Sequence, residues 1–260
     1  MIDFTLKKYI ILLRQLINKA FIFQAVNDFL ENPLEKSVMM RHDIDRLPQN
    51  ALAIAKIENE LGVKATYYFR ISPHVFNESI IKQIIDLGHE IGYHYENLDH
   101  CKGNIDKAYD DFCINLEKFR KLYPVKTICM HGSPLSKWDN RAIWEKYDYK
   151  KLGIIGEPYF DIDYSEIFYL TDTGWKWNNS VSNIRDKVSS GFNIPVKSTS
   201  ALIKFIEDDK LPNRIMINTH PHRWFNFGLG WCKELIGQKL KNIIKLILLV
   251  LPTFSCKLPA

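Results

Sequence analysis

The stretch SVMMRHDID, residues 37–45, decides the fold, because it joins a buried strand to chemically active side chains. Its first half is an apolar run of strand length, and Pro48 then opens a helical pattern. Short apolar runs that alternate with helical patterns are typical of parallel strands joined by crossover helices. The stretch therefore predicts an α/β fold in which the first main strand ends at Asp43 and Asp45.

The same order of strand, loop and helix repeats along the chain. Further strands are predicted at residues 65–71, 89–95, 127–132, 152–156, 167–172 and 214–220, and helices at 4–18, 48–61, 78–87, 104–122, 140–147 and 200–208. We predict one domain over residues 1–260, folded as an irregular (β/α) barrel with added N-terminal and C-terminal helices. Its parts are a helical lead-in at 1–36, the barrel at 37–225 and a helical extension at 226–260.

Composition and charge exclude several classes of protein. Of 260 residues, 46% are hydrophobic and 25% charged, which is ordinary globular usage. The net charge of +5 comes from 35 basic and 30 acidic residues without a basic block, so no nucleic-acid partner is expected. The five cysteines include no C-x-x-C pair, which favours a reduced, cytoplasmic protein. Lys7, Lys8 and Arg14 interrupt the first apolar segment, so we expect no signal peptide.

The C-terminal region is apolar and basic. Residues 243–251 read IIKLILLVL, with Lys239 and Lys241 just before them. This run is shorter than the roughly 20 residues that span a bilayer. Three interpretations stay open: a helix docked on the body of the protein, a basic interfacial anchor that gives a peripheral membrane contact through residues 239–251, and a dimer contact.

Two carboxylates close the first main strand. Asp43 and Asp45 are two residues apart, so their side chains point to the same side of a strand. Their repulsion is relieved when one binds a divalent cation and the other accepts a proton. Alternatively, Asp45 caps the helix that begins near Pro48.

Histidines follow other strands at corresponding places. His94 lies near the end of the strand at 89–95, His131 lies near the end of the strand at 127–132, and His220 ends the strand at 214–220, with His222 just after it. Neutral imidazole is a common ligand of divalent metals, and histidine titrates near neutral pH, which suits a general acid. A single histidine in a strand is more often a hydrogen-bonded core residue than a metal ligand. Together they indicate a metal-dependent site at the carboxyl ends of the strands.

These motifs resemble those of a known family. The stretch 88–94, GHEIGYH, matches the G-H-E-I-G-N-H motif of the NodB-homology polysaccharide deacetylases, carbohydrate esterase family 4, at six of seven positions. Residues 41–45, RHDID, resemble the D-x-D variant of the family's T-F-D-D-G motif, and His220 matches its late histidine. The resemblance runs from Val38 to about Trp224, and it is closest to the branch found among surface-polysaccharide and O-antigen biosynthesis genes.

The resemblance implies roles for these residues. It makes Asp43 the catalytic base, Asp45 and His94 metal ligands, and His220 the residue that assists the leaving group. It also implies a divalent metal ion, with zinc as the first choice for a site rich in histidine and carboxylate.

The chain departs from the family at the next expected ligand. The family places a second metal histidine four residues after the first, where this chain has Leu98. The R-x-P-x-G motif of the fourth strand is also replaced, by MHGSP. We therefore predict His131 as the third metal ligand, with His100 and Glu96 as alternatives.

The function that follows is a metal-dependent hydrolase that removes an N-acetyl or other acyl group from a sugar or glycan. Trp175 and Trp224 are candidates to stack on a sugar ring, and Arg223 is a candidate to pair with an acidic group of the carbohydrate. Two other functions stay open. Leu98 also fits a non-catalytic glycan-binding or assembly protein, and the D-x-D motif also fits a sugar-nucleotide transferase.

Overall fold

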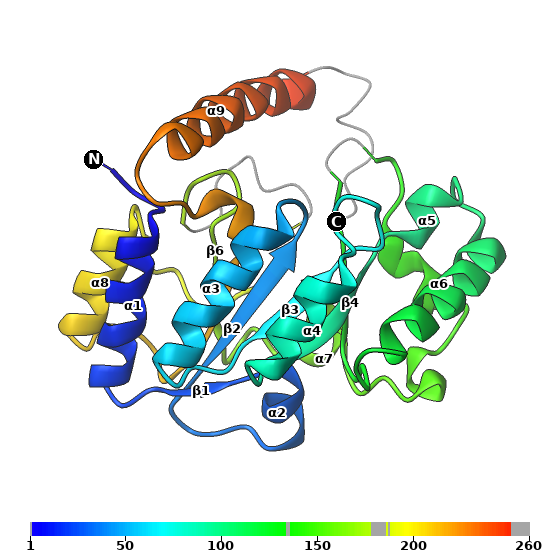
Figure 1. Ribbon diagram of the computed structural model, residues 1–260, viewed down its shortest axis with the longest axis horizontal. Helices are drawn as coiled ribbons and strands as arrows, with labels where there is room; N and C mark the ends of the chain where they lie inside the picture. The colour runs from blue at the N-terminus through cyan, green and yellow to red at the C-terminus, as the bar shows by residue number, and fades with distance from the viewer. Residues whose placement is uncertain (1, 134–135, 178–185, 187, 251–260) are drawn as a thin grey trace.

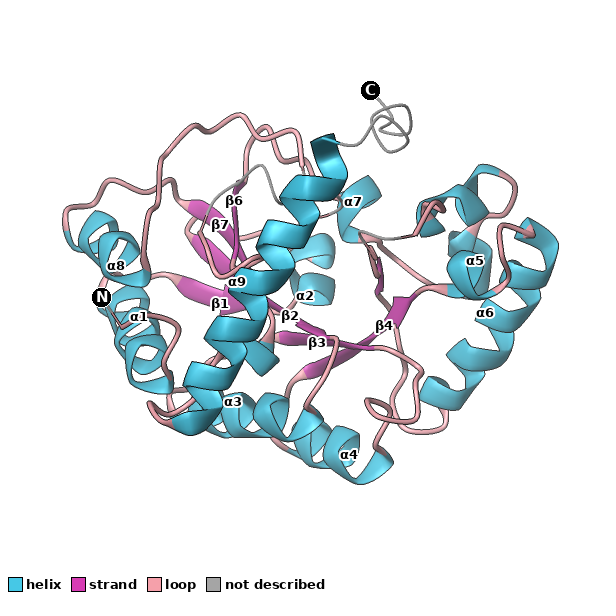
Figure 2. Ribbon diagram, turned by 90° about the horizontal axis from the view of Figure 1, so that it is seen from above, coloured by secondary structure: helices cyan, strands magenta, loops and turns pink. Residues whose placement is uncertain are grey.

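The computed structural model describes residues 2–133, 136–177, 186 and 188–250, and it shows a curled parallel sheet flanked by helices (Figures 1 and 2). The seven strands run in the order β5-β4-β3-β2-β7-β6, with β1 paired to β2, and every pairing is parallel. The strands are β1 (Ile22–Gln24), β2 (Ser37–Ile44), β3 (Thr66–Phe69), β4 (Glu90–Tyr95), β5 (Ile128–Met130), β6 (Phe168–Thr171) and β7 (Arg214–Thr219). Strands β5 and β6 end the path, so the predicted irregular barrel is confirmed as a half-barrel that stays open between them.

The helices lie around this sheet and at its two ends. They are α1 (Leu6–Asn18), α2 (Val26–Glu31), α3 (Pro48–Glu60), α4 (Glu78–Asp86), α5 (Asn97–His100), α6 (Ile105–Arg120), α7 (Pro158–Asp161), α8 (Thr199–Glu207) and α9 (Leu229–Val250), with short 3-10 helices η1 (Asn140–Glu145), η2 (Tyr149–Leu152) and η3 (Pro221–Arg223). Helices α1 and α8 pack together, and α9 crosses above the end of the sheet to which β2 points (Figures 1 and 2). Within the described part of the chain, no helix is both long and apolar enough to cross a membrane.

Strand β2 is buried along its whole length, as expected for a central strand of a parallel sheet. Successive side chains point to opposite faces. Met40 joins the apolar cluster under the outer helices, whereas Met39 joins the cluster inside the curl of the sheet. Arg41 and Asp43 follow Met39 at intervals of two, so they also face the inside of the half-barrel.

His42 faces the opposite way and takes part in a buried polar network. Its Nε2 lies 2.8 Å from Glu58 Oε1, and the Tyr9 and Tyr67 hydroxyls donate to the same carboxylate. Burial alone would raise the pKa of Glu58, but His42, His89 and the Tyr67 hydroxyl together outweigh it and the pKa is lowered. The charged Glu58 thus links α1, α3, β2 and β3 on the outer side of the sheet, away from Asp43.

Most of the predicted elements are present, but some differ. Residues 152–156 form no strand: Gly153, with a φ of +73°, ends η2, and Gly156 makes only an isolated bridge to Thr127. The helix predicted at 140–147 is the 3-10 helix η1. Strand β1 lies inside the region predicted as a helical lead-in, because residues 22–24 pair in parallel with β2.

Candidate metal centre and active site

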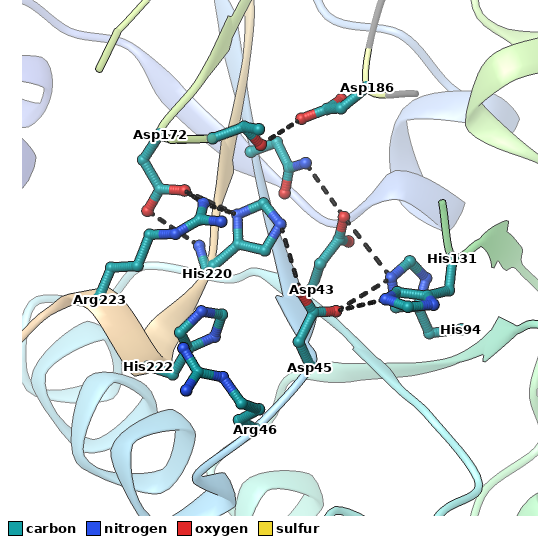
Figure 3. A network of polar contacts seen from close by, with 12 residues as sticks. Asp43, Asp45, Arg46, His94, His131, Asp172, Asp186, His220, His222 and Arg223 are labelled. Atoms are coloured by element: carbon teal, nitrogen blue, oxygen red, sulfur yellow. Dashed lines mark hydrogen bonds and ion pairs between the residues drawn. The ribbon is translucent and has the colours of Figure 1, made fainter. Parts of the chain in front are cut away.

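The polar residues predicted at the strand ends meet inside the mouth of the half-barrel. Because β2, β4, β5 and β7 are parallel, their carboxyl ends lie at one edge of the sheet. Asp45 follows β2, His94 lies in β4, His131 follows β5 and His220 follows β7. Figure 3 shows His94 and His131 side by side facing Asp45, with His220 approaching Asp45 from the other side.

Asp45, His94 and His131 form a cluster with the dimensions of a metal site. The His94 Nε2 and His131 Nε2 atoms lie 3.6 and 3.5 Å from Asp45 Oδ1. Ligands about 2.1 Å from a tetrahedral zinc ion lie about 3.4 Å from one another. Asp45 Oδ1 is buried and has no hydrogen-bond partner among the described residues. The three side chains therefore fit a divalent cation, and one ligand atom of each lies within 4.8 Å of the others.

The Nδ1 atom of His94 and that of His131 each contact an oxygen outside the cluster, so that Nε2 of each ring faces the cluster. His94 Nδ1 is hydrogen-bonded to the Cys129 carbonyl oxygen at 2.9 Å. His131 Nδ1 lies 2.9 Å from Glu96 Oε2, and Arg70 holds that carboxylate through two hydrogen bonds. Backbone carbonyls and carboxylates in this position orient histidines that bind metals. The surroundings thus present both Nε2 lone pairs to one point.

The two alternative third ligands, Glu96 and His100, are not part of the cluster of Asp45, His94 and His131. Burial raises the pKa of Glu96, but His131 and Arg70 outweigh it and hold the pKa at about 2, so Glu96 is charged and already paired. His100 is half exposed, and its Nε2 lies 3.5 Å from Glu96 Oε1. Leu98 is buried in the apolar core. Asp45 does not cap α3 either, because the N-cap residue is Leu47 and no side chain caps it.

Asp43 lies beside the cluster and is held by an arginine from its own strand. Arg41 donates to both oxygens of Asp43, at 2.9 and 2.7 Å, and Asn218 donates to Oδ2 at 3.1 Å. Its Oδ2 lies 3.8 Å from His94 Nε2. Burial alone would raise the pKa of Asp43, but the Arg41 guanidinium and the nearby histidines outweigh it and hold the pKa at about 2. Asp43 is therefore a charged carboxylate of fixed orientation.

Asp172, which was not among the residues predicted from the sequence, holds His220 in place. Asp172 Oδ1 lies 2.7 Å from His220 Nδ1, and its Oδ2 accepts the His220 backbone N–H at 3.0 Å. His220 Nε2 lies 3.8 Å from Asp45 Oδ2, so the ring points at the cluster. Burial raises the pKa of Asp172, but Arg223 and His220 outweigh it and hold the pKa well below its usual range. Asp172 could have been predicted as a site residue, because it is a carboxylate at the end of the predicted strand 167–172.

A second carboxylate missed by the sequence analysis, Asp186, lies further inside the half-barrel (Figure 3). It accepts hydrogen bonds from four hydroxyl groups, those of Tyr159, Tyr169, Thr171 and Thr173. The Tyr169 hydroxyl also accepts from Asn218 Nδ2, the amide that binds Asp43. Polar contacts thus run from Asp43 to β6.

Two of the three predicted substrate contacts, Trp224 and Arg223, are buried and bind Asp172. Trp224 is 1% exposed, and its Nε1 donates to Asp172 Oδ2 at 2.8 Å. Arg223 is 6% exposed, and its Nη1 lies 2.6 Å from Asp172 Oδ1. Both side chains are almost fully buried, and their role as substrate contacts stays a prediction. Trp175 is half-buried beside Phe4, and its role as a substrate contact stays a prediction.

His222 is a weaker candidate for a general acid than His220. Its side chain is buried, and burial together with the Arg223 charge lowers its pKa well below the usual value. A neutral imidazole is a very weak acid, so His222 is a poor proton donor, whereas the His220 ring points at the cluster.

Comparison with known proteins finds similarity at the level of solved structures. No protein-family model matches the chain, and no curated protein matches it. A CE4 esterase from Streptococcus mutans matches with a TM-score of 0.46, 14% identity and 88% coverage of both chains. A CE4 family pseudoenzyme from Bacillus anthracis matches with a TM-score of 0.45, 15% identity and 82% coverage of this chain. A mutant of that pseudoenzyme with restored enzymatic activity matches equally well. This chain spans 63 to 65% of the length of these two, which is less than two thirds.

Proposed function

We propose that this protein is a metal-dependent hydrolase that removes an N-acyl group from a sugar or glycan. The observation that supports this most strongly is the arrangement around Asp45, His94 and His131: a charged carboxylate lies on one side and a histidine paired with an aspartate on the other. Hydrolysis of an amide needs a base for water and an acid for the leaving amine. The two sides of the cluster offer one group for each task.

The metal would be held by Asp45, His94 and His131, and a donor set of two imidazoles and one carboxylate suits zinc. When bound, such an ion lowers the pKa of water and polarises a carbonyl group. We assign proton removal to Asp43, which is ionised at neutral pH and cannot turn away because Arg41 binds both of its oxygens.

His220 would give its proton to the departing nitrogen. Asp172 orients the ring through Nδ1 and stabilises the charged form of the imidazole. Arg223 and Trp224 fix Asp172 in turn, so that the acid is held by buried contacts. A role in cell-surface polysaccharide synthesis remains part of this proposal.

The proposal is tested by acyl release from N-acylated sugars. Zinc-loaded wild-type protein is incubated with a panel of N-acetylated and N-formylated amino sugars, free and nucleotide-linked, and with chitin oligomers, and the released acid is measured. We expect activity on at least one substrate, and a loss of about 10²- to 10⁴-fold in His220→Asn with zinc content unchanged. The matched control is His100→Asn, on the surface. A wild-type protein that holds zinc and hydrolyses nothing in the panel would favour the glycan-binding alternative.

A further inference from the structure

Helix α9 presents an apolar stripe to solvent. Leu229, Ile236, Leu240 and Ile243 are spaced by seven, four and three residues, which places them on one helix face. Leu229 is 92% exposed and Ile236 68% exposed, and Phe227, just before the helix, is exposed as well. Apolar residues in a continuous exposed patch mark a contact surface. We name these five residues the α9 face.

The charges beside the α9 face have one sign. Lys233 and Lys239 are exposed among and beside its apolar residues. Glu234 is the single acidic residue in the sequence of α9, and its carboxylate is 13% exposed and paired with Arg46 at 2.7 Å. The exposed side of the helix therefore combines apolar side chains with positive charge.

The opposite side of α9 is fixed to the body of the protein. Trp231 Nε1 donates to the Asp3 carbonyl oxygen at 2.7 Å, and Asn242 Nδ2 donates to the Gly174 carbonyl oxygen at 2.8 Å. Since these contacts and the Glu234 pair lie on the side of α9 that meets the body, the helix is already docked. Among the described residues, none covers its apolar face.

We propose that the α9 face docks on an anionic lipid surface. A helix with an apolar stripe and flanking lysines lies in the plane of a membrane, with the stripe in the headgroup region and the ammonium groups on lipid phosphates. A second copy of the chain fits less well, because symmetric packing of this face would bring lysines against lysines. A groove of about 580 Å³, lined by Ile2, Lys7, Lys8 and Ile11 among others, continues the apolar and basic surface from Phe227.

Docking in this way places the candidate active site near the bilayer. Helix α9 crosses above the end of the sheet that carries the histidines (Figures 1 and 2). His222 Nε2 lies 4.0 Å from Glu234 Oε1. Helix α9 then lies between the candidate site and the lipid headgroups. Binding to lipid requires neither the metal nor catalysis, so it can be tested whether or not the proposed hydrolase activity is correct.

The test is vesicle flotation with the full chain. Vesicles of equal parts phosphatidylglycerol and phosphatidylcholine are compared with vesicles of phosphatidylcholine alone. We expect binding to the anionic vesicles that weakens as salt is added. We also expect at least a tenfold loss in the double variants Ile236→Asp/Leu240→Asp and Lys233→Glu/Lys239→Glu.

Matched controls come from other surfaces. Ile114 on α6 is 60% exposed, so Ile114→Asp makes the same chemical change away from α9. Lys64→Glu/Lys121→Glu reverses the same number of exposed charges. Both controls should bind as wild type does. The proposal is overturned if wild-type protein does not float with anionic vesicles, or if the controls lose as much binding as the α9 variants. It is also overturned if sedimentation shows a dimer that Ile236→Asp/Leu240→Asp dissolves while lipid binding is unchanged.

Discussion

Replacing Asp172 by asparagine removes the negative charge that binds both His220 and Arg223. Asp172 is fully buried and receives contacts from Arg223, His220 and Trp224 at 2.6, 2.7 and 2.8 Å. Asparagine has nearly the same volume, so the substitution changes charge and hydrogen bonding without opening a cavity. The Arg223 guanidinium, 8% exposed, is then left without its ion-pair partner.

An uncompensated buried charge costs about 3–5 kcal/mol of the free energy of unfolding. Because asparagine still accepts one hydrogen bond, we expect about 3 kcal/mol for Asp172→Asn. For a chain of this size, that lowers the melting temperature by roughly 6–12 °C. The double variant Asp172→Asn/Arg223→Met should regain part of this loss, because neither charge then remains buried.

The pH dependence of this difference has a definite sign. The folded-state pKa of Asp172 lies below its usual value, because Arg223 and His220 outweigh the effect of burial. Its contribution to stability is therefore fully present above the unfolded pKa of about 3.9, and it is lost as pH falls toward the lower folded pKa. The difference between wild type and Asp172→Asn should be constant between about pH 5 and pH 8 and should shrink below about pH 4.

Urea unfolding followed by tryptophan fluorescence measures this difference. The control is Asp106→Asn, which breaks the exposed pair of Asp106 with Lys146 and should leave the unfolding midpoint unchanged. A loss below about 1 kcal/mol in Asp172→Asn would refute the reasoning. A double variant that is less stable than the single variant would refute it as well.

Further predictions concern the strand interior and two glycines. In Arg41→Met the pKa of Asp43 should rise, because burial then acts without the guanidinium, and the acidic limb of the pH–rate profile should move to higher pH. In Gly92→Ala the new Cβ would lie 2.3 Å from the Tyr68 ring, so urea unfolding should show a loss of about 1–3 kcal/mol. By contrast, Gly237→Ala in α9 meets nothing within 4 Å and should be neutral or stabilising by up to about 1 kcal/mol in the same assay.

The cluster was predictable because it follows from strand polarity. Asp45, His94 and His131 each end or follow a strand that the sequence pattern identifies, and parallel strands bring these ends together. The interval of two between Arg41 and Asp43 could also have placed the guanidinium on the site face. The sequence analysis gave Arg41 no role, because an arginine inside an apolar strand carries no sign of its partner.

Contacts between distant segments were not predictable in the same way. Asp172 and His220 lie 48 residues apart, and the intervening sequence shows no pattern that pairs them. Trp224 and Arg223 were interpreted as substrate contacts from residue type alone. The burial of Trp224 depends on its packing against Phe4 and Tyr9, which brings α1 and the segment before it to the end of β7.

The zinc content of purified variants tests the proposed metal centre most directly. After zinc loading and exhaustive dialysis, elemental analysis should find about one zinc ion per wild-type chain, as expected for a site of three protein ligands. Asp45→Asn, His94→Gln and His131→Gln should lose the ion, Glu96→Gln should bind it about 10- to 100-fold more weakly, and His100→Gln should keep it. A wild-type protein that retains no zinc would contradict the account. So would a His131→Gln variant that binds zinc as well as His100→Gln does.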